Sequence, residues 1–178
     1  MGHAEYVALA CRWLTGFVFL AAAAPTARGF DGFRRSVAAM APRLATRSAA
    51  VAGTVTAAEL LVVALLVAPE TATWGMAAAL VLDAAFIAAI VSALRRGVRE
   101  PCRCFGATER GLGAREVVRD VILGALTALG LLAGAAGLPA WNPAGWLVAA
   151  VAGSVGALLL DLFDDIAELF FPGRPGQV

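Results

Sequence analysis

Long apolar runs alternate with short polar segments along the chain. Five runs, at about residues 6–24, 49–68, 74–94, 117–137 and 144–163, are each about 20 residues long, the length that crosses a hydrocarbon core as a helix. Without water to bind its polar groups, the backbone of such a run must be helical. The pattern predicts an all-α integral membrane bundle of about five transmembrane helices, forming one domain over residues 1–178.

The composition agrees with this class. Hydrophobic residues make up 61% of the chain and charged residues only 15%, whereas a soluble domain has about a quarter of its residues charged. The formal net charge of +1 argues against nucleic acid as a partner. The expected surroundings are a lipid bilayer, and association into an oligomer stays open.

Arginine placement predicts how the bundle is oriented. Arginines gather between the first two spans and again between the third and fourth, and lysine is absent. The positive-inside rule then puts the N-terminus outside and the 95–116 loop in the cytoplasm, in a multi-pass protein of the bacterial inner (plasma) membrane. Alternatively, the first run is a signal peptide that is cleaved before Arg28.

The segment after the first span carries an amphipathic pattern. Phe30, Phe33, Val37 and Met40 recur at helical spacing, and Arg34 lies off their face. This spacing predicts a short helix with an apolar side. It either lies on the inner leaflet or packs as a connector against the bundle.

The third connecting segment holds the best candidate for chemistry. Cys102 and Cys104 lie one residue apart. A disulfide closed over one residue is strained and therefore easily reduced. Arg99 and Arg103 flank the pair, and cations favour the reactive thiolate. The pattern indicates a redox pair. Two structural cysteines remain an alternative, and a zinc site is disfavoured because it needs four ligands and His3 is the only histidine.

Ionisable residues within spans are a second candidate site. Arg12, Glu59 and Asp83 lie inside the first three apolar runs, where such residues are functional by default. They are expected to form an internal polar cluster. It would serve as a proton path, as a pocket for a quinone-like cofactor, or as an ion pair that fixes helix register. Cys11, also in the first span, is expected to pack in the core.

A family resemblance rests on the loop and its surroundings. The first helix carries Arg12 and a Leu-Thr-Gly-Phe-Val-Phe run, and the second carries Glu59. The chain resembles the methylamine utilisation protein MauE family, which is grouped with DoxX-like redox-associated membrane proteins. The residues of the loop region that carry the likeness are Cys102-Arg103-Cys104-Phe105-Gly106, Gly111-Leu112-Gly113, Arg115 and Arg119-Asp120.

The resemblance implies a fold and a function. It implies a four-helix DoxX-like core with an added C-terminal helix. It also implies that Cys102 and Cys104 form a redox pair that supports maturation of a partner, in the family the methylamine dehydrogenase light chain. The expected partner is a protein thiol or disulfide, either thioredoxin-like or exported.

The side of the membrane on which the cysteines lie and the functional class of the protein both leave alternatives open. An exported partner needs the cysteines outside, whereas the arginines put them inside. The pair therefore takes electrons from the cytoplasm, or the loop dips into the membrane, or the topology is inverted. A possible thiol–disulfide oxidoreductase is the leading interpretation. A non-enzymatic membrane scaffold or assembly subunit and a quinone-binding bundle are the alternatives.

Overall fold

The computed structural model describes residues 3–98, 114–134 and 142–162, and the part of the chain described is helical apart from short turns. The side chains of residues 3, 25–28, 43, 44 and 161 lie outside this description. The helices are α1 (His3–Arg28), α2 (Phe30–Met40), the 3-10 helix η1 (Pro42–Arg47), α3 (Ser48–Val67), the 3-10 helix η2 (Pro69–Thr71), α4 (Ala72–Arg95), α5 (Ala114–Gly134) and α6 (Pro143–Asp161).

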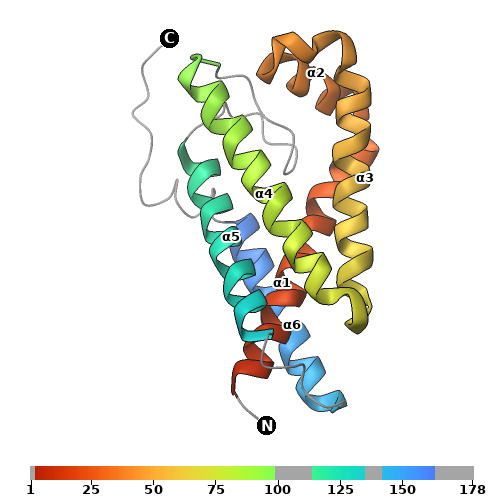
Figure 1. The fold of residues 1–178 in the computed structure, drawn as a ribbon, viewed down its shortest axis with the longest axis vertical. Helices are drawn as coiled ribbons and strands as arrows, with labels where there is room; N and C mark the ends of the chain where they lie inside the picture. Colours follow the sequence, from red (N-terminus) through yellow and green to blue (C-terminus); the bar gives the residue numbers. More distant parts are fainter. Residues whose placement is uncertain (1–2, 99–113, 135–141, 163–178) are drawn as a thin grey trace.

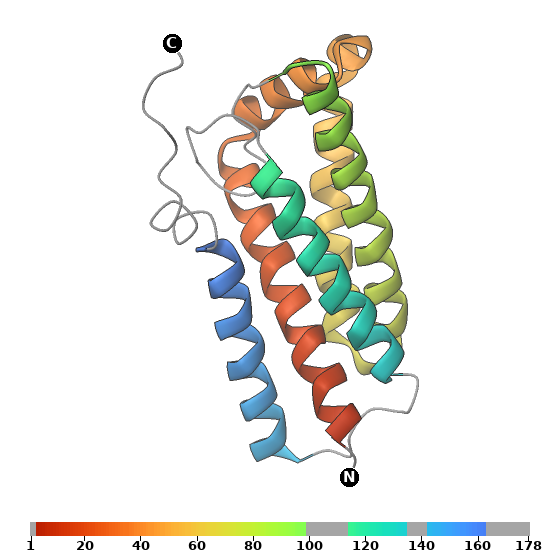
Figure 2. The ribbon, with the colours of Figure 1, turned by 90° about the vertical axis from the view of Figure 1, so that its left-hand side faces the viewer.

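The five long helices lie side by side as a bundle (Figures 1 and 2). Helix α1 is central, because it packs against α3, α5 and α6, while α4 packs against α3 and α5. Five helices of the described chain are long and apolar enough to cross a membrane. The predicted all-α membrane bundle with about five spans is confirmed.

The two ends of the bundle differ. At the loop end, α4 finishes at Arg95, α5 begins at Ala114, and α2 crosses the neighbouring helices (Figure 1). At the turn end, η2 joins α3 to α4 directly. We call the end where α4 finishes and α5 begins the loop end, and the end where η2 joins α3 to α4 the turn end.

Helix α2 packs against the bundle through its apolar face. Phe33, Val37 and Met40 are buried in one cluster with Ile90 of α4 and Ala52 of α3. Arg34 and Arg35 lie on the opposite, exposed face. Of the two interpretations of this amphipathic segment, the structure shows the second, in which the segment packs against the bundle as a connector.

Large apolar side chains cover the outside of the spans. In a soluble protein such exposure would be an aggregation hazard, but in a bilayer these side chains meet lipid tails. They occur in all five spans, and those more than half exposed lie in α3, α4, α5 and α6 and include Leu61, Val67, Val81, Leu132, Leu147 and Val148. The outward apolar surface agrees with a membrane setting.

Candidate functional site

The helices that carry the cysteine loop meet at one end of the bundle. Helix α4 leads into the loop and α5 leads out of it, and the two helices pack side by side. The loop therefore joins two neighbouring helix ends. The candidate redox residues Arg99, Cys102, Arg103 and Cys104 lie outside the described residues.

The start of the loop is fixed by a glycine at the end of α4. Gly97 has φ of 75°, a left-handed conformation that glycine adopts without a Cβ clash. The Gly97 N–H donates to the Leu94 carbonyl at 2.9 Å, and the Val98 N–H donates to the Ala93 carbonyl at 3.1 Å. These two bonds form the Schellman motif, which satisfies the last carbonyls of a helix and stops it.

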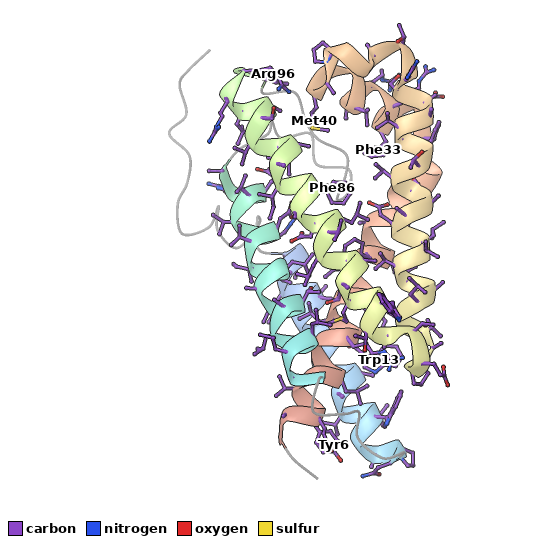
Figure 3. The ribbon with its side chains drawn as sticks, viewed as in Figure 1. Tyr6, Trp13, Phe33, Met40, Phe86 and Arg96 are labelled. Carbon is purple, nitrogen blue, oxygen red and sulfur yellow. The ribbon has the colours of Figure 1, made fainter. Side chains whose placement is uncertain are left out.

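Arg96 ties this helix end to α2. Its guanidinium donates to the Met40 carbonyl, at the end of α2, and to the Ser92 hydroxyl (Figure 3). Val98 packs against the apolar cluster that contains Phe33 and Ile90. The first residues of the loop therefore leave the bundle from a fixed position beside α2.

Arg12 lies at the turn end and caps α3. Its Nε donates to the Leu66 carbonyl at 2.6 Å, and one Nη donates to the Val67 carbonyl at 2.8 Å. The last carbonyls of a helix have no partner within the helix, and Pro69 prevents α3 from continuing. Trp146 of α6 covers the guanidinium, with its ring centroid 5.7 Å from Cζ. Arg12 thus holds α1, α3 and α6 together.

The structure does not bring Arg12 to the two carboxylates with which it was expected to cluster. Its bonds go to backbone carbonyls at the turn end, whereas Glu59 lies near the middle of α3 and Asp83 near the middle of α4. Both acids are buried, at 1% and 3% exposed. Neither Glu59 oxygen has a hydrogen-bond partner among the described residues. An acid in such surroundings is costly unless it is neutral or paired.

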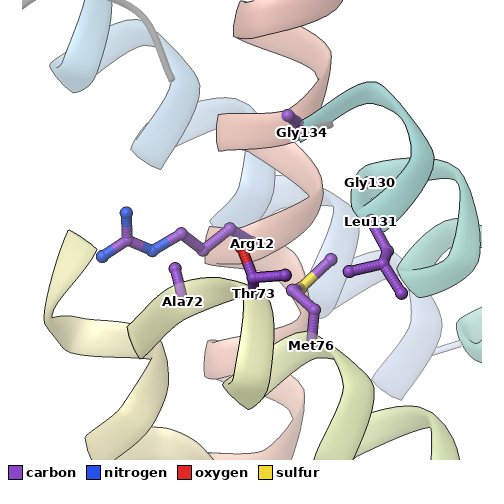
Figure 4. A pocket seen from close by; sticks show the side chains of 8 residues that line it. Arg12, Ala72, Thr73, Met76, Gly130, Leu131 and Gly134 are labelled. Carbon is purple, nitrogen blue, oxygen red and sulfur yellow. The ribbon is translucent and has the colours of Figure 1, made fainter. Parts of the chain in front are cut away.

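A small cavity lies beside Arg12 between α1, α4 and α5 (Figure 4). Its volume is about 30 Å³, and it is lined by Arg12, Thr73, Met76 and Leu131 among others. The Arg12 guanidinium extends away from Met76 and Leu131. Pockets for small organic ligands are about 300–1,000 Å³. This cavity therefore has the size for water and lacks the size for a quinone ring.

Cys11 is buried in the core near the same cavity. It is 7% exposed and belongs to the main apolar cluster. Helix α5 approaches it closely, since a methyl group built on Gly130 would lie 2.5 Å from the Cys11 Cβ and 2.6 Å from the Met76 Cε. Cys11 is thus a packed thiol toward the turn end, away from the loop end.

Two polar contacts of the interior were not expected from the sequence. Thr15 of α1 and Thr127 of α5 share a buried hydrogen bond of 3.0 Å. Asp120, which the sequence singled out only as part of the family likeness, is fully buried beside Arg119. One signal could have found them: Asp120, Gly124 and Thr127 recur at helical spacing along one face of α5.

Residues 4–133 match the family model described as methylamine utilisation protein MauE. The matched stretch runs from α1 into the last turn of α5 and contains the whole cysteine loop. No curated protein matches the chain, and no solved structure matches it either. Because the family model covers well over half of the chain, this multi-pass membrane protein belongs to the MauE family.

Proposed function

We propose that this protein performs thiol–disulfide exchange through Cys102 and Cys104 and thereby supports the maturation of a partner protein. One observation carries the proposal: the family match covers the stretch with the Cys-Arg-Cys-Phe-Gly block. The chemistry of the block supports it, because a disulfide over one residue is strained and the neighbouring Arg99 and Arg103 favour the thiolate.

The exchange is balanced without a further reactant. A thiolate of the partner attacks one sulfur of the Cys102–Cys104 disulfide and forms a mixed disulfide. The partner's second thiolate then attacks the partner's own sulfur in that bond. The partner leaves with a disulfide, and Cys102 and Cys104 become a dithiol that has gained two electrons and two protons.

The fixed start of the loop supports this role. At about 3.3–3.6 Å per residue, the chain keeps Cys102 within about 14 Å of Val98, whose position is fixed by the end of α4. The proposal therefore expects the pair to meet its partner at the loop end of the bundle. Cys11 belongs to the core instead and takes no part in the exchange.

Thiol counting before and after reduction tests the proposal. The full-length protein in detergent is treated with a maleimide of known mass, with and without prior reduction. We expect the wild type to gain two reactive thiols on reduction. The matched control Cys11→Ser removes a buried thiol and should still gain two reactive thiols on reduction.

The variants Cys102→Ser and Cys104→Ser are each expected to lose this gain, because a single cysteine cannot close the bridge. Incubation with a reduced dithiol peptide provides the second readout: the wild type should oxidise the peptide one-for-one, and either variant should not. An unchanged thiol count on reduction of the wild type, or peptide oxidation by Cys104→Ser at the wild-type yield, contradicts the proposal.

A further inference from the structure

Glu59 lies in the middle of the face that α3 turns toward the bundle. The buried residues of this helix recur at helical spacing along one side and are Ser48, Ala52, Glu59, Val62 and Leu66. Ala52 belongs to the apolar cluster under α2, and Val62 and Leu66 belong to the main core cluster. Glu59 itself is 1% exposed. A carboxyl group is thus enclosed by protein, and its nearest neighbours on this buried face are apolar.

Among the described residues, the helices packed against this face bring no partner to the carboxyl. Helices α1, α2 and α4 all pack against α3, yet both carboxyl oxygens of Glu59 are buried without a hydrogen-bond partner. Arg12 of α1 binds backbone carbonyls at the turn end instead. Asp83 of α4 lies against α5, since a methyl group built on Gly124 would be 2.6 Å from its Oδ2.

Other charged side chains on the elements around α3 face outward. Those described on α2, α4 and the two 3-10 helices include the exposed residues Asp31, Arg34, Arg35, Arg47, Glu70 and Arg95. Burial dominates the surroundings of the Glu59 carboxyl, and no described cation pairs with it. Within the described part of the chain, this acid therefore has neither a hydrogen-bond donor nor a counter-charge.

Such surroundings select the neutral form of the acid. An isolated carboxylate is very costly in an apolar interior, and the group takes up a proton instead. A metal ion would need several ligands, and no group of three potential ligands occurs among the described residues. A proton needs no second ligand, so it is the cation that fits a lone carboxyl in this position. Ionisable residues inside a membrane span are functional candidates by default.

We propose that Glu59 is an intramembrane proton-binding site on α3, which holds one proton in the resting protein. The site stands apart from Arg12, which caps the end of the same helix. Because protein covers the carboxyl, the proton exchanges with solvent when α3 separates from its neighbours. The site is independent of the thiol chemistry and stands whether or not Cys102 and Cys104 exchange disulfides.

Infrared spectroscopy at neutral pH tests the site directly. The full-length protein is prepared in dodecyl maltoside, a detergent without a carbonyl group, with and without ¹³C at the side-chain carboxyl of glutamate. A protonated carboxyl absorbs apart from a carboxylate, and the isotope lowers its frequency, so the label separates glutamate from aspartate. We expect the wild type to show a protonated carboxyl band that shifts with the label. Glu59→Gln should lose this band.

Asp83→Asn is the matched control, since it removes a buried acid from the neighbouring span and leaves α3 unchanged. The labelled band should persist in it at the wild-type intensity. Loss of the band in Asp83→Asn would show that the proton depends on a second acid and would overturn the isolated site. A labelled band that persists in Glu59→Gln overturns the proposal as well.

Glu59→Met provides a second variant where Glu59→Gln fails to fold. Methionine is a flexible apolar side chain that fills irregular spaces in a core, and it removes no hydrogen bond that the described structure contains. We expect a folded protein that lacks the labelled band. The wild-type measurement decides without any variant: if no protonated glutamate band appears at neutral pH, the proposal is wrong.

Discussion

At the scale of residues, Arg12 explains why a charged side chain lies within the first span. The end of α3 leaves carbonyl groups without partners, and no water is present in the hydrocarbon region to bind them. The planar guanidinium reaches two of them at once. Its charge is covered by the Trp146 ring, which favours a cation on its face. The charged residue thus serves the fold through backbone capping.

Arg12→Lys should therefore destabilise the protein although it keeps the charge. A lysine ammonium is a compact point charge and cannot reproduce the planar fork or the stacking. We expect a loss of about 1–3 kcal/mol in the free energy of unfolding, the typical cost of leaving a buried polar group unpaired. Thermal unfolding in detergent measures the effect.

The same substitution at an exposed arginine is the control for that experiment. Arg34 is 47% exposed and pairs with Asp31 at 3.7 Å, and such surface pairs contribute about 0–1 kcal/mol. Arg34→Lys should leave the unfolding temperature nearly unchanged. Equal effects at the two positions would show that Arg12 is not a cap.

At the scale of elements, α6 packs closely against α1 through small residues. A methyl group built on Gly153 would lie 2.7 Å from the Trp13 Cβ and 2.8 Å from the Ala10 carbonyl oxygen. Helices in lipid associate through such close packing, since no hydrophobic effect drives them together. Because α6 carries Trp146, its position on α1 also decides whether Arg12 is covered.

Gly153→Ala is expected to push α6 away from α1. The nearest atoms include α1 backbone, which cannot move aside as a flexible side chain can, and overpacking costs about 1–3 kcal/mol. Tryptophan fluorescence, to which Trp13 at this contact contributes, and thermal unfolding should both change.

Gly53→Ala provides the matched control, because nothing lies within 4 Å of a methyl group there. Alanine favours a helix over glycine by about 1 kcal/mol, so this variant should be neutral or more stable. A Gly153→Ala protein as stable as Gly53→Ala would mean that the close contact does not hold α6.

At the scale of the whole molecule, arginines gather at the loop end. The exposed arginines of the described chain that lie there are Arg34, Arg35, Arg47, Arg95 and Arg96. The turn end has Arg12, which is buried. From this asymmetry the positive-inside rule predicts, as it did from the sequence, that the loop end lies in the cytoplasm. The orientation decides which partner the cysteine pair can meet, a thioredoxin-like protein inside or an exported protein outside.

Two single cysteines, in a protein whose own cysteines are replaced by serine, test this orientation. Thr46→Cys marks the loop end and Glu70→Cys marks the turn end, and both positions are exposed. A membrane-impermeant maleimide should label the second variant in intact cells and the first only after permeabilisation. The reverse result places the cysteine loop outside and favours an exported partner.

The sequence alone determined the class, the number of spans and the family. Apolar runs of about 20 residues must become helices wherever water is absent, so length and hydropathy suffice for that prediction. The Cys-Arg-Cys-Phe-Gly block and the residues around it identified the family, which the match over residues 4–133 confirms. The roles of Cys102 and Cys104 stay predictions, since both lie outside the described residues.

Only the tertiary structure decided which buried polar groups meet. The sequence placed Arg12, Glu59 and Asp83 inside three apolar runs, and this placement alone suggested one cluster. The direction in which a side chain points around the helix axis also matters, and the packing of the helices against one another decides it. Arg12 points to the end of α3, while Asp83 points to Gly124 of α5. These orientations depend on contacts between helices far apart in the chain, which periodicity within one helix does not encode.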